Sequence, residues 1–179
     1  MTSKNRPVAF LDRDGIINVD TGYPHRPDEL ILTPTSARAI ARINRAGCLA
    51  IVVTNQSGVA RGMFSLDDVE RFHLAIQKKL DEAGGHIDAF YVAPYHPDGI
   101  IPEYAIEHPD RKPGSGMILR ALAEWPIDTK RSILFGDKSS DIEAAKRANI
   151  ASERLPGDTC DLDAAVAGWL KRLNVIAHR

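Results

Sequence analysis

Apolar residues in this chain fall into short continuous runs and into longer stretches with helical spacing. The continuous runs cover residues 8–11, 49–53, 89–92 and 132–135, and the first, second and fourth are followed directly by Asp12, Thr54 and Gly136. Runs this short, apolar at almost every position, are typical of strands buried on both faces. The sequence therefore predicts four strands of a parallel sheet.

The stretches between these runs carry apolar residues three or four positions apart, the period of an amphipathic helix. Ser65 and Asp68 form a capping pattern before one of them, with Asp where Glu or Gln is more usual. Pro34 fits a first helical turn, and Gly47 is a stop signal. The pattern predicts helices over residues 35–46, 66–83, 116–124, 139–148 and 162–173.

Strands alternating with helices predict an α/β fold: a three-layer, Rossmann-like parallel sheet with helices on both faces. At 179 residues, the chain suits a single domain over residues 1–179. It leaves no room for a large cap domain. The long segment between residues 93 and 113 is rich in Pro, His and Tyr, and loops of that length inside compact domains are usually functional or disordered.

Composition narrows the function classes. The chain is 44% hydrophobic and 26% charged, with a net charge of -1, and it lacks the basic surplus that a nucleic-acid partner requires. Its first residues form too short an apolar stretch for a signal peptide, and no segment is long enough to span a bilayer. Cys48 and Cys160 stand alone. We expect a cytoplasmic monomer without nucleic-acid or membrane partners.

Polar residues gather where the predicted strands end. Asp12 and Asp14 follow the first strand, Thr54 and Asn55 the second, and Asp137 the fourth. Open parallel sheets bind ligands in the crevice at the carboxyl ends of their strands. These side chains are therefore expected to meet at one edge of the sheet.

The D-x-D-G sequence that begins at Asp12 has other interpretations. A calcium loop would place its glycine two residues later than Gly15, and no strand precedes an EF-hand loop. A simple turn remains an alternative, because Asp and Gly are common turn residues. If the carboxylates cluster, their repulsion of about 4 kcal/mol per pair at 4 Å calls for a cation. An all-oxygen ligand set favours Mg²⁺ over zinc or copper.

Four motifs in this order resemble those of the haloacid dehalogenase (HAD) superfamily phosphatases: DRDGIIN, VVTNQSGVARG, DRKP and GDKSSD. The resemblance spans about residues 8–148. HRPDEL, VTNQSGVARG and RKPGSGM are more similar to the group of D,D-heptose 1,7-bisphosphate phosphatases and histidinol-phosphatases. NVDTGYPHRPDEL resembles the heptose enzymes more closely.

The resemblance implies a mechanism. Asp12 would attack phosphorus to form an aspartyl-phosphate, and Asp14 would act as general acid and then as base. The carboxylates of Asp12 and Asp137, with the main-chain carbonyl of Asp14, would hold Mg²⁺. Thr54 and the Asn55 amide would donate hydrogen bonds to the phosphoryl oxygens. Lys112 would neutralise charge on the transferring group.

The resemblance also implies substrate contacts. Arg111 would bind a second phosphate or a sugar oxygen. Lys138 would touch substrate and Asp141 would orient Lys112, although both could equally be solvated charges at a helix start. Tyr23 could instead only pack its loop. The full set of expected substrate-binding residues is Asp20, Thr21, Gly22, Tyr23, Asn55, Gln56, Ser57, Arg111 and Lys138.

The heptose phosphatases that this sequence resembles commonly hold a structural zinc in the loop before the RKP motif. Here the matching positions carry Ala93, Tyr95, His108 and Asp110, without any thiolate. Four-coordinate zinc needs four good ligands, so we expect no zinc. A pairing of His96 with His108 would not supply that set. We expect a small apolar cluster to order the loop instead, made of Tyr91, Tyr95, Ile100, Ile101 and Tyr104.

The sequence thus predicts a magnesium-dependent phosphomonoester hydrolase acting on a small phosphorylated sugar. The first expectation is removal of the 7-phosphate of D-glycero-D-manno-heptose 1,7-bisphosphate, in nucleotide-heptose and surface-polysaccharide synthesis. Histidinol phosphate or another small sugar phosphate is the alternative substrate. A non-catalytic HAD-like binding module is a remote alternative, because all four motifs are intact.

Overall fold

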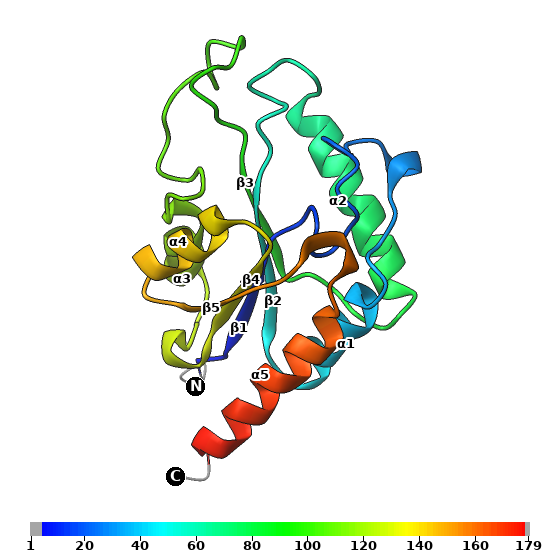
Figure 1. Ribbon diagram of the computed structural model, residues 1–179, viewed down its shortest axis with the longest axis vertical. Helices are drawn as coiled ribbons and strands as arrows, with labels where there is room; N and C mark the ends of the chain where they lie inside the picture. The colour runs from blue at the N-terminus through cyan, green and yellow to red at the C-terminus, as the bar shows by residue number, and fades with distance from the viewer. Residues whose placement is uncertain (1–4, 178–179) are drawn as a thin grey trace.

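The computed structural model describes residues 5–177, and side chains as far as residue 173. Five parallel strands form one sheet in the order β3-β2-β1-β4-β5 (Figure 1). The strands are β1 (Val8–Leu11), β2 (Leu49–Asn55), β3 (Ala89–Ala93), β4 (Ile133–Gly136) and β5 (Ala151–Arg154). The helices are α1 (Ser36–Arg45), α2 (Leu66–Asp81), α3 (Gly116–Glu124), α4 (Ser139–Arg147) and α5 (Leu162–Ala177). Three 3₁₀ turns lie at Pro27–Glu29, Thr129–Arg131 and Gly157–Thr159.

Helices cover both faces of the sheet, as the α/β prediction requires. Successive side chains of a strand point to opposite faces. Ala9 and Leu11 of β1 accordingly pack into one core with α1, α2 and α5, while Val8 and Phe10 pack into the other with α3 and α4. Figure 1 shows α1, α2 and α5 on one side of the sheet and α3 and α4 on the other. The three-layer arrangement is confirmed.

The predicted strands are all present, within one or two residues of the expected ends. Strand β5 was not predicted. It pairs only with β4 at the edge of the sheet, and its sequence is ASER, with every residue exposed or half-buried. An edge strand with polar residues lacks the apolar run by which a buried strand is recognised. Its pairing with β4 is a tertiary effect.

The helix ends follow the predicted local signals closely. The Ser65 hydroxyl accepts a hydrogen bond from the Asp68 N–H at 3.1 Å, and the Asp68 carboxylate accepts the Ser65 N–H at 2.8 Å. This reciprocal pair satisfies two N–H groups that the first turn of α2 leaves without partners. Gly47 follows α1 with φ +74°, a left-handed conformation that favours glycine.

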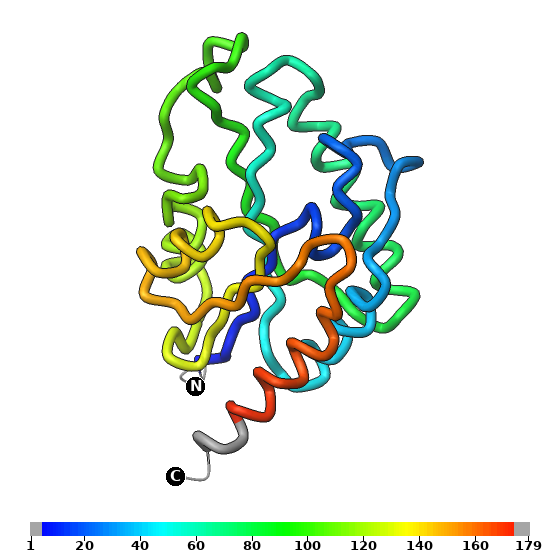
Figure 2. The backbone as a smooth tube through the Cα atoms, viewed as in Figure 1, coloured from blue at the N-terminus to red at the C-terminus, as the bar shows by residue number. Residues whose placement is uncertain are grey.

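The strand order places a ligand crevice beside β1. The chain runs from β1 outward through β2 and β3, then returns to the other side of β1 with β4. Such a reversal opens a crevice beyond the carboxyl ends of the two central strands. Figure 2 shows the long loop of residues 94–115 beside the turn that follows β2, on the side of the sheet where the strands end. Main-chain hydrogen bonds from Ile100 and Ile101 to the Ala60 carbonyl join these two segments.

Within residues 5–177, no helix combines the length and the apolar character that a bilayer-spanning segment needs.

Candidate active site

A buried ion cluster forms the floor of the crevice. The Lys112 Nζ lies 2.9 Å from Asp12 Oδ1 and 2.6 Å from Asp141 Oδ1. Asp12 directly follows β1, where its N–H donates to the Phe135 carbonyl of β4. Asp141 stands in the first turn of α4 and accepts the Lys138 N–H at 2.9 Å. One lysine is thus held between two carboxylates from different elements, as expected for Asp141.

Asp137 adds a third carboxylate to this floor. Oxygens of Asp12, Asp137 and Asp141 lie within 4.8 Å of one another. A Cβ at position 15 would come within 2.8 Å of Asp137 Oδ2, so only glycine lets the carboxylate pack against the chain directly after Asp14. Asp137 Oδ1 is buried and accepts no hydrogen bond from the described residues. A buried carboxylate oxygen without a donor has the character of a cation ligand.

The charge balance of the floor is unfavourable. Burial raises the pKa of Asp12 to about 6, because Lys112 only partly offsets the loss of water and the nearby Asp141 repels. Burial also raises the pKa of Asp137, and Asp141 adds to the effect. For Lys112, burial lowers the pKa, but Asp12 and Asp141 outweigh it and the net shift is upward. The lysine therefore stays charged among carboxylates that outnumber it.

These residues fit magnesium. The available donors are all oxygens, they converge from the ends of β1 and β4, and one of them lacks any other partner. Hard oxygen ligands of this kind suit Mg²⁺ rather than zinc or copper. Both oxygens of Asp141 are used, Oδ1 by Lys112 and Oδ2 by the Lys138 N–H, whereas Asp12 Oδ2 and Asp137 Oδ1 accept no hydrogen bond from the described residues. Asp12 and Asp137 are therefore the side chains that would hold the ion.

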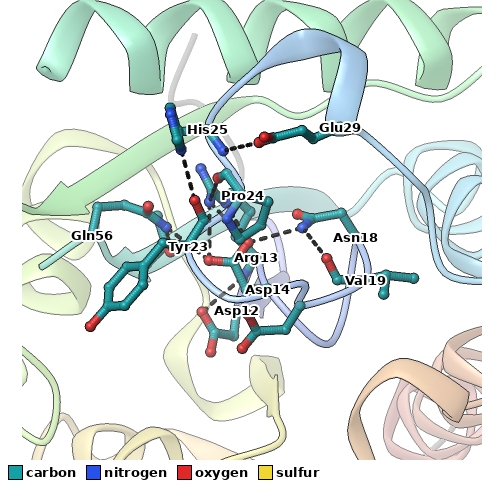
Figure 3. Close-up of polar contacts among 12 residues, drawn as sticks. Asp12, Arg13, Asp14, Asn18, Val19, Tyr23, Pro24, His25, Glu29 and Gln56 are labelled. Carbon is teal, nitrogen blue, oxygen red and sulfur yellow. Dashed lines mark hydrogen bonds and ion pairs between the residues drawn. The ribbon is translucent and has the colours of Figure 1, made fainter. Parts of the chain in front are cut away.

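Thr54, Gln56 and Asp14 are linked beside this floor. The Gln56 carboxamide donates to Asp14 Oδ2 at 3.0 Å and to Thr54 Oγ1 at 2.9 Å. Figure 3 shows Gln56, which directly follows β2, extending toward Asp14. Gln56 was expected to bind substrate. Its side chain is buried and occupied by these two contacts, so its geometry suits a brace for Asp14 and Thr54.

Asn55 fixes the backbone of Lys112. Its carboxamide donates to the Lys112 carbonyl at 3.0 Å and accepts the Lys112 N–H at 2.9 Å. This pair of bonds joins the end of β2 to the loop that supplies the lysine. Because the side-chain amide is taken up in this way, a contact from Asn55 to a phosphoryl group has to come from its main-chain N–H.

A cavity of about 550 Å³ opens above the floor. This is a size typical of small-molecule sites. The backbone of Tyr23 is in the left-handed region, at φ +57°. Thr21 does not line this cavity; it borders a neighbouring cavity of about 450 Å³. Among the expected residues the cavity is lined by Asp12, Asp14, Asp20, Gly22, Tyr23, Asn55, Gln56, Ser57, Arg111, Lys112 and Lys138; Pro113 and Ser140, not expected, join them.

Charged side chains from separate segments line this cavity. The Lys138 Nζ lies 3.5 Å from Asp20 Oδ2. Burial lowers the pKa of Lys138, but Asp12, Asp137 and Asp20 outweigh it and raise the pKa. On the side of the long loop, Arg111 Nη1 donates to the Tyr95 carbonyl at 3.1 Å. The cavity therefore offers two cations at positions separate from Lys112.

The long loop is ordered by an aromatic stack. The Tyr95 ring lies on the His108 ring at a centroid distance of 3.8 Å, and the His108 Nδ1 accepts the Asp110 N–H at 3.1 Å. His96 does not meet His108; its Nε2 lies 3.1 Å from Arg61 Nη2. Three of the four positions that match the zinc-binding positions of the resembling phosphatases, Tyr95, His108 and Asp110, thus take part in this stack and turn. A tyrosine–histidine stack of this kind does not fit a zinc site.

The expected apolar cluster is only partly correct. Tyr95 and Tyr104 contact each other, with ring centroids 6.1 Å apart. Ile100 is 73% exposed and Tyr91 belongs to the core under α3, where its hydroxyl donates to Glu124. The prediction failed for these two residues because an apolar residue near a loop in sequence need not turn toward it.

Comparisons with known proteins identify relatives of this chain in sequence and in fold. The family model of the haloacid dehalogenase-like hydrolases matches residues 98–153. A D-glycero-beta-D-manno-heptose-1,7-bisphosphate 7-phosphatase of Rhodopseudomonas palustris is 44% identical over 161 residues, which are 90% of this chain and 89% of that protein. A D-glycero-alpha-D-manno-heptose-1,7-bisphosphate 7-phosphatase of Photorhabdus laumondii is 41% identical and covers 80% of this chain and 78% of its own length.

A solved structure is similar throughout the fold. The D,D-heptose 1,7-bisphosphate phosphatase of B. bronchiseptica, complexed with magnesium and phosphate, superposes with a TM-score of 0.83 at 29% identity. The match covers 93% of this chain and 99% of that one.

Proposed function

Because this chain belongs to the haloacid dehalogenase-like hydrolases and is a phosphatase, we propose that it removes the 7-phosphate of D-glycero-D-manno-heptose 1,7-bisphosphate. The observation that carries the proposal is the Asp12–Lys112–Asp141 cluster, buried at the floor of a cavity with further cations on its walls. The names of the relatives support the sugar, and relatives of both anomer types occur at similar identity.

Asp12 is the nucleophile in this proposal. The Arg13 N–H and the Lys112 ammonium both bind Oδ1, which leaves Oδ2 without a hydrogen bond from the described residues. Attack by Asp12 on phosphorus breaks the bond between phosphorus and the sugar oxygen and forms an aspartyl-phosphate. Asp14 gives its proton to the departing sugar oxygen and later takes one from the water that releases phosphate.

The remaining residues of the floor neutralise the negative charge of the phosphoryl group, directly or through a bound ion. Lys112 stays cationic and lies beside Asp12, where the negative charge of the transferring group develops. Asp12 and Asp137, with the main-chain carbonyl of Asp14, hold Mg²⁺ in this proposal. When bound, the ion supplies positive charge that lets a dianionic phosphate approach a carboxylate. The relative with bound magnesium and phosphate supports the choice of magnesium.

The walls of the cavity select the sugar. Arg111 and Lys138 stand at the rim as cations for the second phosphate, since arginine binds such oxyanions through two parallel N–H groups. Asp20 and Tyr23, from the loop after β1, offer an acceptor and a hydroxyl to sugar hydroxyl groups. A bisphosphate is thus held at both ends, one phosphate on the floor and one at the rim.

A substrate panel tests this function. We expect phosphate release from heptose 1,7-bisphosphate, in either anomer, to exceed release from histidinol phosphate and from a monophosphate heptose. The activity should disappear when magnesium is removed by a chelator and return when it is restored. If histidinol phosphate is the better substrate, the sugar assignment is wrong while the phosphatase assignment stands.

We also propose that this protein needs no structural zinc. The Tyr95–His108 stack and the absence of a thiolate at the matching positions support this. Elemental analysis of protein purified in zinc-containing buffer is expected to give far less than one zinc per chain. Stoichiometric zinc would contradict the proposal.

A further inference from the structure

Arg13, between the two catalytic aspartates, is the largest fully buried side chain of the described chain. A buried arginine must use its donors, because an unpaired guanidinium is very costly away from water. Its Nε donates to Asp14 Oδ1 at 2.9 Å and its Nη2 donates to Asp14 Oδ2 at 3.0 Å. Arg13 therefore grips the Asp14 carboxylate through a planar, two-bond fork.

The rest of the guanidinium is fixed from behind. Nη2 also donates to the Pro24 carbonyl at 2.8 Å, and the guanidinium carbon lies 4.6 Å from the centre of the Phe72 ring. Nη1 lies 3.4 Å from His73 Nε2 on α2. Phe90 of β3 stacks on the His73 ring at 4.2 Å. The guanidinium that binds Asp14 is thus held in place by residues of α2 and β3.

His73 can serve Arg13 only as an acceptor. Burial lowers the pKa of His73 to about 3, and the charge of Arg13 adds to the effect. The imidazole is therefore neutral at ordinary pH. With the Arg13 N–H directed at Nε2, the ring proton has to stand on Nδ1.

Two amides complete the environment of Asp14. Asn18 Nδ2 donates to Oδ1 at 2.9 Å and Gln56 Nε2 donates to Oδ2 at 3.0 Å. Figure 3 shows Asp14 and Arg13 between Gln56 and Asn18. Each oxygen of the ionised carboxylate thus has two donors, which hold the group at the cavity that it lines, and one amide has to release its oxygen when Asp14 carries the proton that it donates.

We infer that Arg13 is a positioning residue for the acid–base step, and that His73 supports it by holding the guanidinium in place. Arg13 does not touch substrate, because it is completely buried. It acts by setting where the Asp14 carboxylate lies relative to Asp12. This inference rests on the acid–base role of Asp14 in the proposed function.

The dependence of rate on leaving group tests the inference. Proton donation matters for a sugar alkoxide, and it is unnecessary for p-nitrophenyl phosphate or acetyl phosphate, whose leaving groups depart as anions. The kcat/KM reports the steps up to formation of the aspartyl-phosphate, so it isolates the acid step. For Arg13→Met we expect kcat/KM on the sugar phosphate to fall about 100-fold, the scale of a general-acid contribution, while the values for the two activated substrates change little.

His73→Phe is the second variant, and it keeps Arg13 and the stack on Phe90. It removes only the acceptor, so we expect the same selective loss at about 10-fold, comparable to other supporting hydrogen bonds around active sites. His73→Gln restores an acceptor and is expected to recover most of the rate. If Arg13→Met does not fold, the two His73 variants decide the question. An equal loss on all substrates, or no loss in folded variants, would overturn the inference.

Asp14→Asn separates this inference from the proposed function. If Asp14→Asn shows no preference for activated leaving groups, Asp14 is not the acid and the proposed mechanism is wrong. If Asp14→Asn shows the preference while the Arg13 and His73 variants do not, only the positioning role is wrong.

Discussion

Two ionic clusters of this protein are built in opposite ways. Between α1 and α5, Asp163 is shared by Arg38 and Arg42, with N–O distances of 2.8 Å and 2.7 Å. At the active site, Lys112 is shared by Asp12 and Asp141, at similar distances. The first cluster has two cations for one carboxylate and lies partly in water. The second has one cation for two carboxylates, with a third beside it, and is buried.

The difference shows in the pKa values. Hydrogen bonding to Arg42 lowers the pKa of Asp163, so ionisation of this carboxyl stabilises the fold. Burial raises the pKa of Asp12 to about 6, so ionisation of that carboxyl opposes folding until a cation arrives. The α1–α5 cluster is complete within the chain, whereas the active-site cluster needs a ligand. A surplus of like charge is typical of a site kept for function.

Asp12→Asn gives the largest expected effect. Removal of the proposed nucleophile should lower turnover by about 10³-fold or more. The metal-free protein should be no less stable, because the variant removes a carboxyl whose ionised form is disfavoured. Turnover assays and urea unfolding in chelator measure the two quantities. Substantial remaining turnover would remove Asp12 from the nucleophile role.

Lys112→Met should damage both activity and stability. It leaves two carboxylates buried without a cation, a change that typically costs about 3–5 kcal/mol. The rate should fall by about 10² or more because the transferring group loses its neutralising charge. Lys146→Met, at an exposed position of α4, is the matched control and should be close to wild type. A stable Lys112→Met protein would mean that the lysine does not balance the cluster.

Asp163→Asn should show the reverse pattern to Asp12→Asn. The loss of two charge-assisted contacts, both to partly exposed arginines, should lower the free energy of unfolding by about 1–2 kcal/mol. The kcat/KM for the sugar phosphate should stay within about twofold, since a structural pair contributes no transition-state binding. A large activity loss would show that the α1–α5 pair and the site are coupled.

The pH dependence of stability gives the smallest but sharpest contrast. In chelator, the pKa of Asp12 in the folded protein is about 6, above its ordinary value of 3.8. The contribution of Asp12 to the free energy of unfolding should therefore decline as pH rises from about 4 to about 6. The lowered pKa of Asp163 acts in the other direction: its stabilisation is present above about pH 4 and is lost below it. Unfolding of wild type, Asp12→Asn and Asp163→Asn across pH 3–7 measures both slopes. Equal slopes in wild type and Asp12→Asn would contradict the assignment.

The local sequence pattern was enough to predict most of the strands and helices of this protein. Four of the five strands and all five helices follow from runs and periods that depend only on neighbouring residues. The meeting of Asp12 with Asp137 also follows, because parallel strands end at the same edge of the sheet. The pairing of Lys112 with Asp141 came from the resemblance to known motifs and is present in the structure.

The tertiary structure decided how side chains are used. Asn55 and Gln56 have side chains of a type that binds substrates, and both were expected to do so. Their carboxamides instead hold Lys112 and Asp14. The sequence patterns gave Arg13 no role, and its partner His73 lies 60 positions away. Only the fold brings such groups within 3–4 Å, so no local signal could identify them.

The sequence by itself determined the sheet, the helices and the row of carboxylates at the ends of its strands, because these depend on period and order along the chain. The tertiary structure alone decided the edge strand β5, the Tyr95–His108 stack in the long loop and the grip of Arg13 on Asp14. The physical reason is that hydrogen bonds and ion pairs act over a few ångströms of space. Which groups come that close is set by the packing of the whole fold.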